Sequence, residues 1–168
     1  MDLAASATFV AEPAEADLLA RKPRNPRAKF MDTSMITGIL SSGVGLFLAV
    51  SAAYLITWYD SGNLPLSQTV AFFSWLIGHV LLALNMRSER QPLFQLGFLG
   101  NRPMLFWAAA VAIFLVIATI AFPLQSALKT VPLMGGQIFM IFGLTILGTA
   151  WQEIVKLTTF WQKQEKGE

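Results

Sequence analysis

The fold is decided by residues 34–59, SMITGILSSGVGLFLAVSAAYLITWY, which contain no charged side chain. A helix needs about 20 apolar residues to cross the hydrocarbon core of a bilayer, so this stretch is long enough to span with some tilt. Its last two residues, Trp58 and Tyr59, suit the lipid–water interface, where aromatic rings are enriched. The stretch therefore predicts a transmembrane helix.

Three further uncharged stretches follow it, at 66–86, 103–122 and 132–152. Pro103 opens the third of the four spans at a first-turn position, where the missing N–H of proline removes no helical hydrogen bond, and Pro132 opens the fourth. Of the 168 residues 55% are hydrophobic and 13% are charged, whereas a soluble domain carries about 25% charged residues. We therefore expect an all-α, polytopic membrane bundle over 34–152 with four full transmembrane helices.

The segment before the first span divides into an apolar part and a polar part. Residues 1–11, MDLAASATFVA, are mostly small or apolar but reach only about half the length of a span. A secretory signal would start with basic residues, and here the second residue is Asp2. We interpret 1–11 as the end of a transmembrane helix whose beginning is missing. Residues 12–33 contain three prolines and are predicted to be a polar connecting loop.

Positive charges alternate between the segments that join the spans, and cytosolic loops are the ones that retain Lys and Arg. These residues number five in 12–33, none in 60–65, three in 87–102, one in 123–131 and three in 153–168. The alternation predicts that the first connection, the third loop and the tail face the cytosol. We expect an integral protein of a plasma or bacterial inner membrane, with both termini cytosolic.

Two ionisable residues are candidates for chemistry within the membrane. His79, the single histidine, lies near the middle of its span, where an ionisable side chain is costly and usually faces the bundle interior, a partner or water. It is a candidate cation or proton site, or else a neutral imidazole bonded to a neighbouring helix. Asp2 can coordinate a cation if its segment lies within a membrane, or can be solvated at a chain terminus.

Small residues recur every four positions in the first span, at Gly45, Ala49 and Ala53. This spacing places them on one face of a helix and lets another helix approach closely. We predict a structural packing role for them.

Several classes of function are excluded by the composition. The chain has no cysteine, which excludes disulfides and thiolate metal sites. It has no Gly-rich phosphate loop and no Asp-Lys-Thr-Gly motif, so we expect no enzyme activity and no bound cofactor. The net charge of +2 is not accompanied by any groove-reading motif, so no nucleic-acid partner is expected.

Several blocks, in order, resemble the C-terminal transmembrane region of P-type cation-transporting ATPases, from the end of the sixth helix to the tenth. EPAEADLLARKPRNPR at 12–27 is similar to the loop after their sixth helix, and FFSWLIGHVLLALNMRSERQPL at 72–93 to the eighth helix and the loop after it. NRPMLFW at 101–107, LKTVPL at 128–133 and GTAWQEIVKL at 148–157 are similar to the ninth helix start, the next link and the tenth helix end.

The resemblance implies roles for both candidate residues. Asp2 falls at the position of a cation-coordinating Asp of the sixth helix, and His79 where calcium pumps place a coordinating acid in the eighth. Because histidine is a poorer ligand than a carboxylate for hard cations, a proton or another cation would suit it as well as calcium. The implied metal site is thus Asp2 and His79, with a transported cation of unknown identity.

The resemblance favours a C-terminal module that contributes to the membrane transport domain of a pump. Such a module would lack the ATP-hydrolysing domains, would be inactive alone, and would have the bilayer and the remaining half of the pump as partners. The alternative is a small stand-alone membrane protein that binds or regulates a transporter through its small-residue face. A self-contained channel or carrier is less favoured, because one intramembrane ionisable residue provides little for a pathway.

Overall fold

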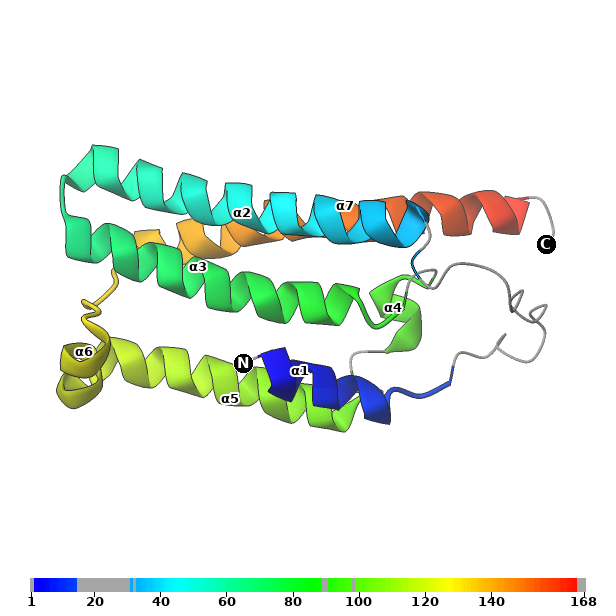
Figure 1. The fold of residues 1–168 in the computed structure, drawn as a ribbon, viewed down its shortest axis with the longest axis horizontal. Helices are drawn as coiled ribbons and strands as arrows, with labels where there is room; N and C mark the ends of the chain where they lie inside the picture. Colours follow the sequence, from blue (N-terminus) through cyan, green and yellow to red (C-terminus); the bar gives the residue numbers. More distant parts are fainter. Residues whose placement is uncertain (1, 15–30, 32, 89–90, 98, 166–168) are drawn as a thin grey trace.

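The computed structural model describes residues 2–14, 31, 33–88, 91–97 and 99–165, and the described chain is helical without strands. Four long helices form the bundle in Figure 1: α2 (Thr33–Ser61), α3 (Leu64–Asn85), α5 (Arg102–Ile120) and α7 (Gly135–Glu165). The short elements are α1 (Asp2–Thr8), the 3₁₀-helix η1 (Phe9–Ala11), α4 (Leu93–Leu96) and α6 (Phe122–Leu128). The prediction of an all-α bundle with a partial N-terminal helix is confirmed.

Each long helix contains a stretch that is long and apolar enough to cross a membrane. The four stretches are Met35–Ser61, Leu64–Asn85, Arg102–Ile120 and Gly135–Thr158. Most of the predicted connecting loop 12–33, including its five basic residues, lies outside the described residues. Helix α7 continues to Glu165, so the first part of the predicted tail 153–168 extends the last helix without a break.

Three of the four helices pack closely, and the fourth is more peripheral. Helices α2, α3 and α7 make the most extensive contacts with one another, whereas α5 touches α3 over a smaller stretch. Figure 1 shows α5 running beside α3, with α1 lying along the first half of α5. The short helix α1 packs mainly on α5, which places the N-terminal segment at the edge of the bundle.

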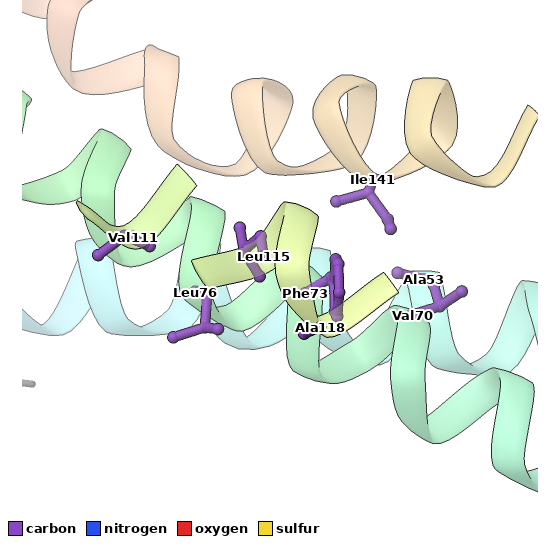
Figure 2. Close-up of a cluster of buried hydrophobic side chains, with 8 residues drawn as sticks. All are labelled: Ala53, Val70, Phe73, Leu76, Val111, Leu115, Ala118 and Ile141. Carbon is purple, nitrogen blue, oxygen red and sulfur yellow. The ribbon is translucent and has the colours of Figure 1, made fainter. Parts of the chain in front are cut away.

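The apolar core joins all four long helices. Figure 2 shows its side chains converging from α2, α3, α5 and α7: Ala53, Val70, Phe73, Leu76, Val111, Leu115, Ala118 and Ile141. Three of them come from α3, which therefore links the peripheral helix α5 to the rest of the bundle. Elsewhere the long helices expose many large apolar side chains, as expected when lipid is the solvent.

Asparagine caps set where α3 and α5 begin. The side chain of Asn63 accepts a hydrogen bond from the backbone N–H of Leu66 at 3.1 Å, and that of Asn101 from Met104 at 2.9 Å. Each cap is followed by a proline in the first turn, where its fixed φ favours the helix. Gly62, at φ +60°, provides the left-handed conformation that reverses the chain between α2 and α3.

Gly45 and Ala49 of α2 lie against α7. A methyl group added at Gly45 would overlap the carbonyl oxygen of Gly148, and one added at Gly148 would lie 2.9 Å from the Cβ of Ala49. Ala49 and Ala53 are 5% and 0% exposed. The two backbones can be this close only because neither glycine has a side chain.

Candidate functional site

His79 is held by its own helix. Its Nδ1 lies 3.1 Å from the backbone oxygen of Trp75, one turn earlier in α3, and its ring packs edge-to-face on the Trp75 indole at 4.7 Å between centroids. Since a carbonyl oxygen can only accept, Nδ1 is the protonated nitrogen in this contact. The half-buried imidazole is therefore oriented by α3 and presents Nε2 as its other polar atom.

The other candidate, Asp2, is the first residue of α1, and its side chain lies outside the described part of the structure. The helix pairs that make the main contacts do not include α1 with α3, which carries His79. Among the described residues, no group of three or more His, Asp or Glu side chains is arranged to hold a metal ion. The assignment of Asp2 and His79 to a cation site thus stays a prediction, and any such site needs further ligands.

An apolar groove lies between α3 and α5, next to His79. It has a volume of about 410 Å³ and is lined by Phe72, Trp75, Leu76, Trp107, Ala110, Val111 and Phe114. Trp75 belongs both to this lining and to the contact with His79. Because the lining carries no carboxylate, the groove suits a hydrocarbon surface and not a cation.

A buried polar cluster joins the N-terminal segment to the ends of α3 and α5; we call Glu12, Arg87 and Asn101 the polar clamp. The guanidinium of Arg87 donates to Glu12 through Nη2 at 2.8 Å and through Nε at 3.0 and 3.1 Å. The amide of Asn101 donates to Glu12 Oε2 at 2.7 Å and to the backbone oxygen of Thr8 at 2.8 Å. Arg87 Nη1 donates to the backbone oxygen of Gly97 at 2.9 Å.

The clamp is withdrawn from solvent. The side chain of Arg87 is 1% exposed and that of Glu12 is 15% exposed. Burial on its own would raise the pKa of the Glu12 carboxyl, but hydrogen bonds from Arg87 and Asn101 and the charge of Arg87 outweigh it, so the pKa lies below its ordinary value of 4.5. Glu12 is therefore ionised at neutral pH and tied to both partners.

The lowered pKa of Glu12 makes the clamp sensitive to acid. A carboxyl whose pKa is lower in the folded state stabilises that state above the unfolded pKa, and this contribution is lost as the pH falls through the folded pKa. We expect the melting temperature of the chain in detergent to fall as the pH drops below about 4.5. In Glu12→Gln this part of the acid dependence should be absent, and an identical pH profile for that variant would contradict the assignment.

A second polar cluster ties α7 to α3 and α4. Asn85, at the end of α3, donates to the backbone oxygen of Thr149 at 2.9 Å, and Lys156 Nζ donates to the backbone oxygen of Asn85. Glu153 accepts from Lys156 at 2.8 Å and from the backbone N–H of Leu93 at 2.9 Å. Both clusters lie beyond the same end of α3, so this end of the bundle is fixed by charged groups.

Neither cluster was predicted from the sequence. Arg87 and Lys156 were interpreted only as topological charges, and Glu12, Asn101 and Glu153 were not singled out. One signal was present, because Asn101 precedes Arg-Pro at the start of an apolar span, which is a helix-cap pattern. Nothing in the local spacing shows that residues 75 positions apart form an ion pair.

Comparison with known proteins agrees with this architecture. The family model described as "Cation transporting ATPase, C-terminus" matches residues 1–158. The chain is 25% identical over 156 residues to the mouse (Mus musculus) calcium-transporting ATPase type 2C member 2, covering 90% of this chain and 16% of that protein. It is 27% identical over 142 residues to a calcium-transporting ATPase of Bacillus subtilis, covering 80% of this chain and 15% of that protein.

A human (Homo sapiens) protein, calcium-transporting ATPase type 2C member 1, is 27% identical over 149 residues, which is 86% of this chain and 16% of that protein. The chain thus spans about a sixth of the length of the curated relatives it matches. The family match covers the partial helix α1 and all four membrane-length helices. This chain belongs to the family of C-terminal membrane regions of P-type cation-transporting ATPases.

Proposed function

We propose that this chain contributes the last four transmembrane helices and part of the cation pathway to an ATP-driven cation pump. The observation that supports it most is the family match over residues 1–158, which begins at the partial helix α1 and reaches the membrane-spanning part of α7. The helix α1 packs on α5, and α5 also lines an apolar groove with α3 that suits a further apolar helix. The remaining helices of the pump would complete the bundle there.

The division of labour follows from the residues that the chain contains. Phosphoryl transfer needs a phosphate-binding loop, a nucleophile or base and Mg²⁺ ligands, and the 168 residues contain no phosphate loop or phosphorylation motif. Energy from ATP would reach these helices from the rest of the pump. Alone, the chain is inactive in this proposal.

The cation pathway of the proposal uses Asp2 and His79. Asp2 would provide carboxylate oxygen from α1, and His79 would provide an imidazole nitrogen from α3. The relatives are named calcium-transporting ATPases, and calcium is therefore the first ion to test. Since calcium prefers oxygen ligands, the histidine makes a proton or a softer cation the competing possibility.

ATP-driven cation uptake by vesicles tests the proposal. Vesicles with the pump that contains this module should take up cation when ATP is added, and vesicles with this chain alone should take up none. His79→Leu should leave insertion intact and reduce uptake by the whole pump, whereas Gln95→Leu, on the exposed helix α4, should not. Normal uptake by the His79→Leu pump would remove His79 from the pathway, and uptake by the chain alone would refute the division of labour.

The proposal includes an orientation in which α3 ends on the cytosolic side. The absence of cysteine lets single cysteines be labelled without background. In intact cells, a membrane-impermeant maleimide should label Asp60→Cys, at the turn between α2 and α3, and should reach Gln95→Cys only after permeabilisation. Both positions are exposed in the structure. The reverse pattern would show that the orientation is inverted.

A further inference from the structure

We propose that the polar clamp of Glu12, Arg87 and Asn101 positions α1, and thereby Asp2, relative to α3 and α5. This makes the three clamp residues positioning residues for cation binding, although they lie outside the membrane spans. The inference about cation binding rests on the proposed function, whereas the inference about the placement of α1 does not.

Helix α1 lies at the edge of the bundle. Its main packing partner is the peripheral helix α5. Leu3 and Val10, near the two ends of the segment, are 88% and 90% exposed. Apolar packing within the described chain therefore does not hold this segment firmly.

Polar groups attach the end of α1 and the residue after η1 directly to Asn101. Thr8, the last residue of α1, and Glu12, just after η1, both accept hydrogen bonds from the Asn101 amide. The same Asn101 side chain caps α5 through the N–H of Met104. One amide therefore fixes the end of α1 to the start of α5.

The clamp also includes a residue just after the end of α3. Arg87 follows Met86, the C-cap of α3, and its guanidinium contacts both Glu12 oxygens. The planar guanidinium restricts the carboxylate in distance and in angle, which a single ammonium contact does not do. The clamp thus fixes the end of α1 against two helices at once, one of which carries His79.

Helix α1 connects the clamp to Asp2, because Thr8 and Asp2 are its two ends. At 1.5 Å rise per residue, Asp2 lies about 9 Å along the helix from Thr8, and the helix between them moves as a unit. A shift or rotation at Thr8 is therefore transferred to Asp2. Groups hydrogen-bonded directly to a metal ligand change metal affinity by about 10- to 100-fold when removed, and the clamp acts through the helix, so we expect the lower end of this range.

Distances between spin labels test the placement of α1. In the full chain in lipid nanodiscs, labels at Ala4→Cys in α1 and Ala109→Cys in α5, both exposed positions, report on this pair of helices. Labels at Val44→Cys and Leu147→Cys, on α2 and α7, report on the fold of the main bundle. We expect Arg87→Gln to broaden the α1–α5 distribution and to leave the α2–α7 distribution unchanged.

Matched variants separate the clamp from a general loss of charge. Arg102→Gln removes a positive charge from an exposed side chain at the start of α5 and should leave both distributions unchanged. The double variant Glu12→Gln/Arg87→Gln leaves no unpaired buried charge and should still broaden the α1–α5 distribution. An α1–α5 distribution equal to that of the wild type in the double variant, with the α2–α7 pair intact, would overturn the proposal.

Cation affinity tests the consequence. In the pump that contains this module, Arg87→Gln should raise the KM for the cation by about tenfold and leave the KM for ATP unchanged, and Arg87→Lys should recover part of the loss. An unchanged cation KM beside a broadened α1–α5 distribution would overturn the link to Asp2. A wild-type pump without cation-dependent activity would refute the proposed function, and the spin-label result would still decide how α1 is placed.

Discussion

Arg87→Met is expected to destabilise the folded chain by about 3 kcal/mol, the lower end of the cost of breaking a buried ion pair, because it leaves the partly buried carboxylate of Glu12 without its cation. The side chain of Arg87 is 1% exposed and that of Glu12 is 15% exposed, so water replaces the lost donors only in part. Methionine retains most of the length of the side chain, which limits the loss of packing. The change in the free energy of unfolding is measured in mixed micelles, by adding a denaturing detergent in increasing amounts and following the helix signal by circular dichroism.

Arg102→Met is the control for this prediction. Arg102 is exposed at the start of α5, and surface substitutions usually change stability by no more than about 0.5 kcal/mol. The double variant Glu12→Gln/Arg87→Met should regain part of the stability lost in Arg87→Met, since it carries no unpaired buried charge. Equal stability of the wild type and Arg87→Met would mean that the clamp does not hold the folded state together.

Gly45→Ala and Gly43→Ala are expected to change stability in opposite directions. The added methyl group at Gly45 meets the carbonyl oxygen of Gly148, and overpacking of this kind costs about 1–3 kcal/mol. The methyl group at Gly43 meets nothing within 4 Å, and alanine is favoured over glycine in a helix by about 0.5–1 kcal/mol. Unfolding midpoints in the same micelles give both values.

The two variants are a matched pair, because they make the same change two residues apart on α2. If Gly45→Ala were as stable as Gly43→Ala, α2 and α7 would be further apart than the structure places them. Gly148→Ala provides the reciprocal check, since its methyl group would lie 2.6 Å from the Gly45 oxygen. Destabilisation by both Gly45→Ala and Gly148→Ala would locate the contact on both helices.

The membrane-length helices could be predicted because their signal is local. A stretch such as 34–59 has no charge over more than the thickness of the bilayer, and no alternative structure satisfies its backbone there. Helix ends were harder to place. Helix α3 begins at Leu64, next to the cap at Asn63, whereas the predicted span begins at 66. Apolar content alone does not detect a cap that lies outside the apolar stretch.

The partners of each helix could not be predicted, because lipid and protein surfaces are equally apolar. The spacing of Gly45, Ala49 and Ala53 indicated a packing face but did not identify α7 as the helix that Gly45 approaches. The faces of α5 were equally hidden: Val111 and Leu115 are buried, while Ile113 and Val116 are 60% and 58% exposed. Such choices depend on long-range contacts.

The polar clamp was missed for a different reason. A charge at the end of a span has an adequate explanation in topology, so Arg87 gave no sign of a buried partner. In the sequence, the helical hairpin of α2 and α3 lies between Glu12 and its partner Arg87. The candidate cation residues Asp2 and His79 came from the family resemblance and from the cost of burying charge, and they remain predictions.

Purification from native membranes tests the central claim most directly. An antibody to the C-terminal sequence QKQEKGE, residues 162–168, would isolate the chain together with whatever it belongs to. The material would then be incubated briefly with radiolabelled ATP and quenched in acid. We expect a hydroxylamine-sensitive phosphoenzyme whose level depends on the transported cation. The contradicting result is purified material that contains the 18.5 kDa chain but no such phosphoenzyme. That result would contradict the assignment of the chain to an ATP-driven pump.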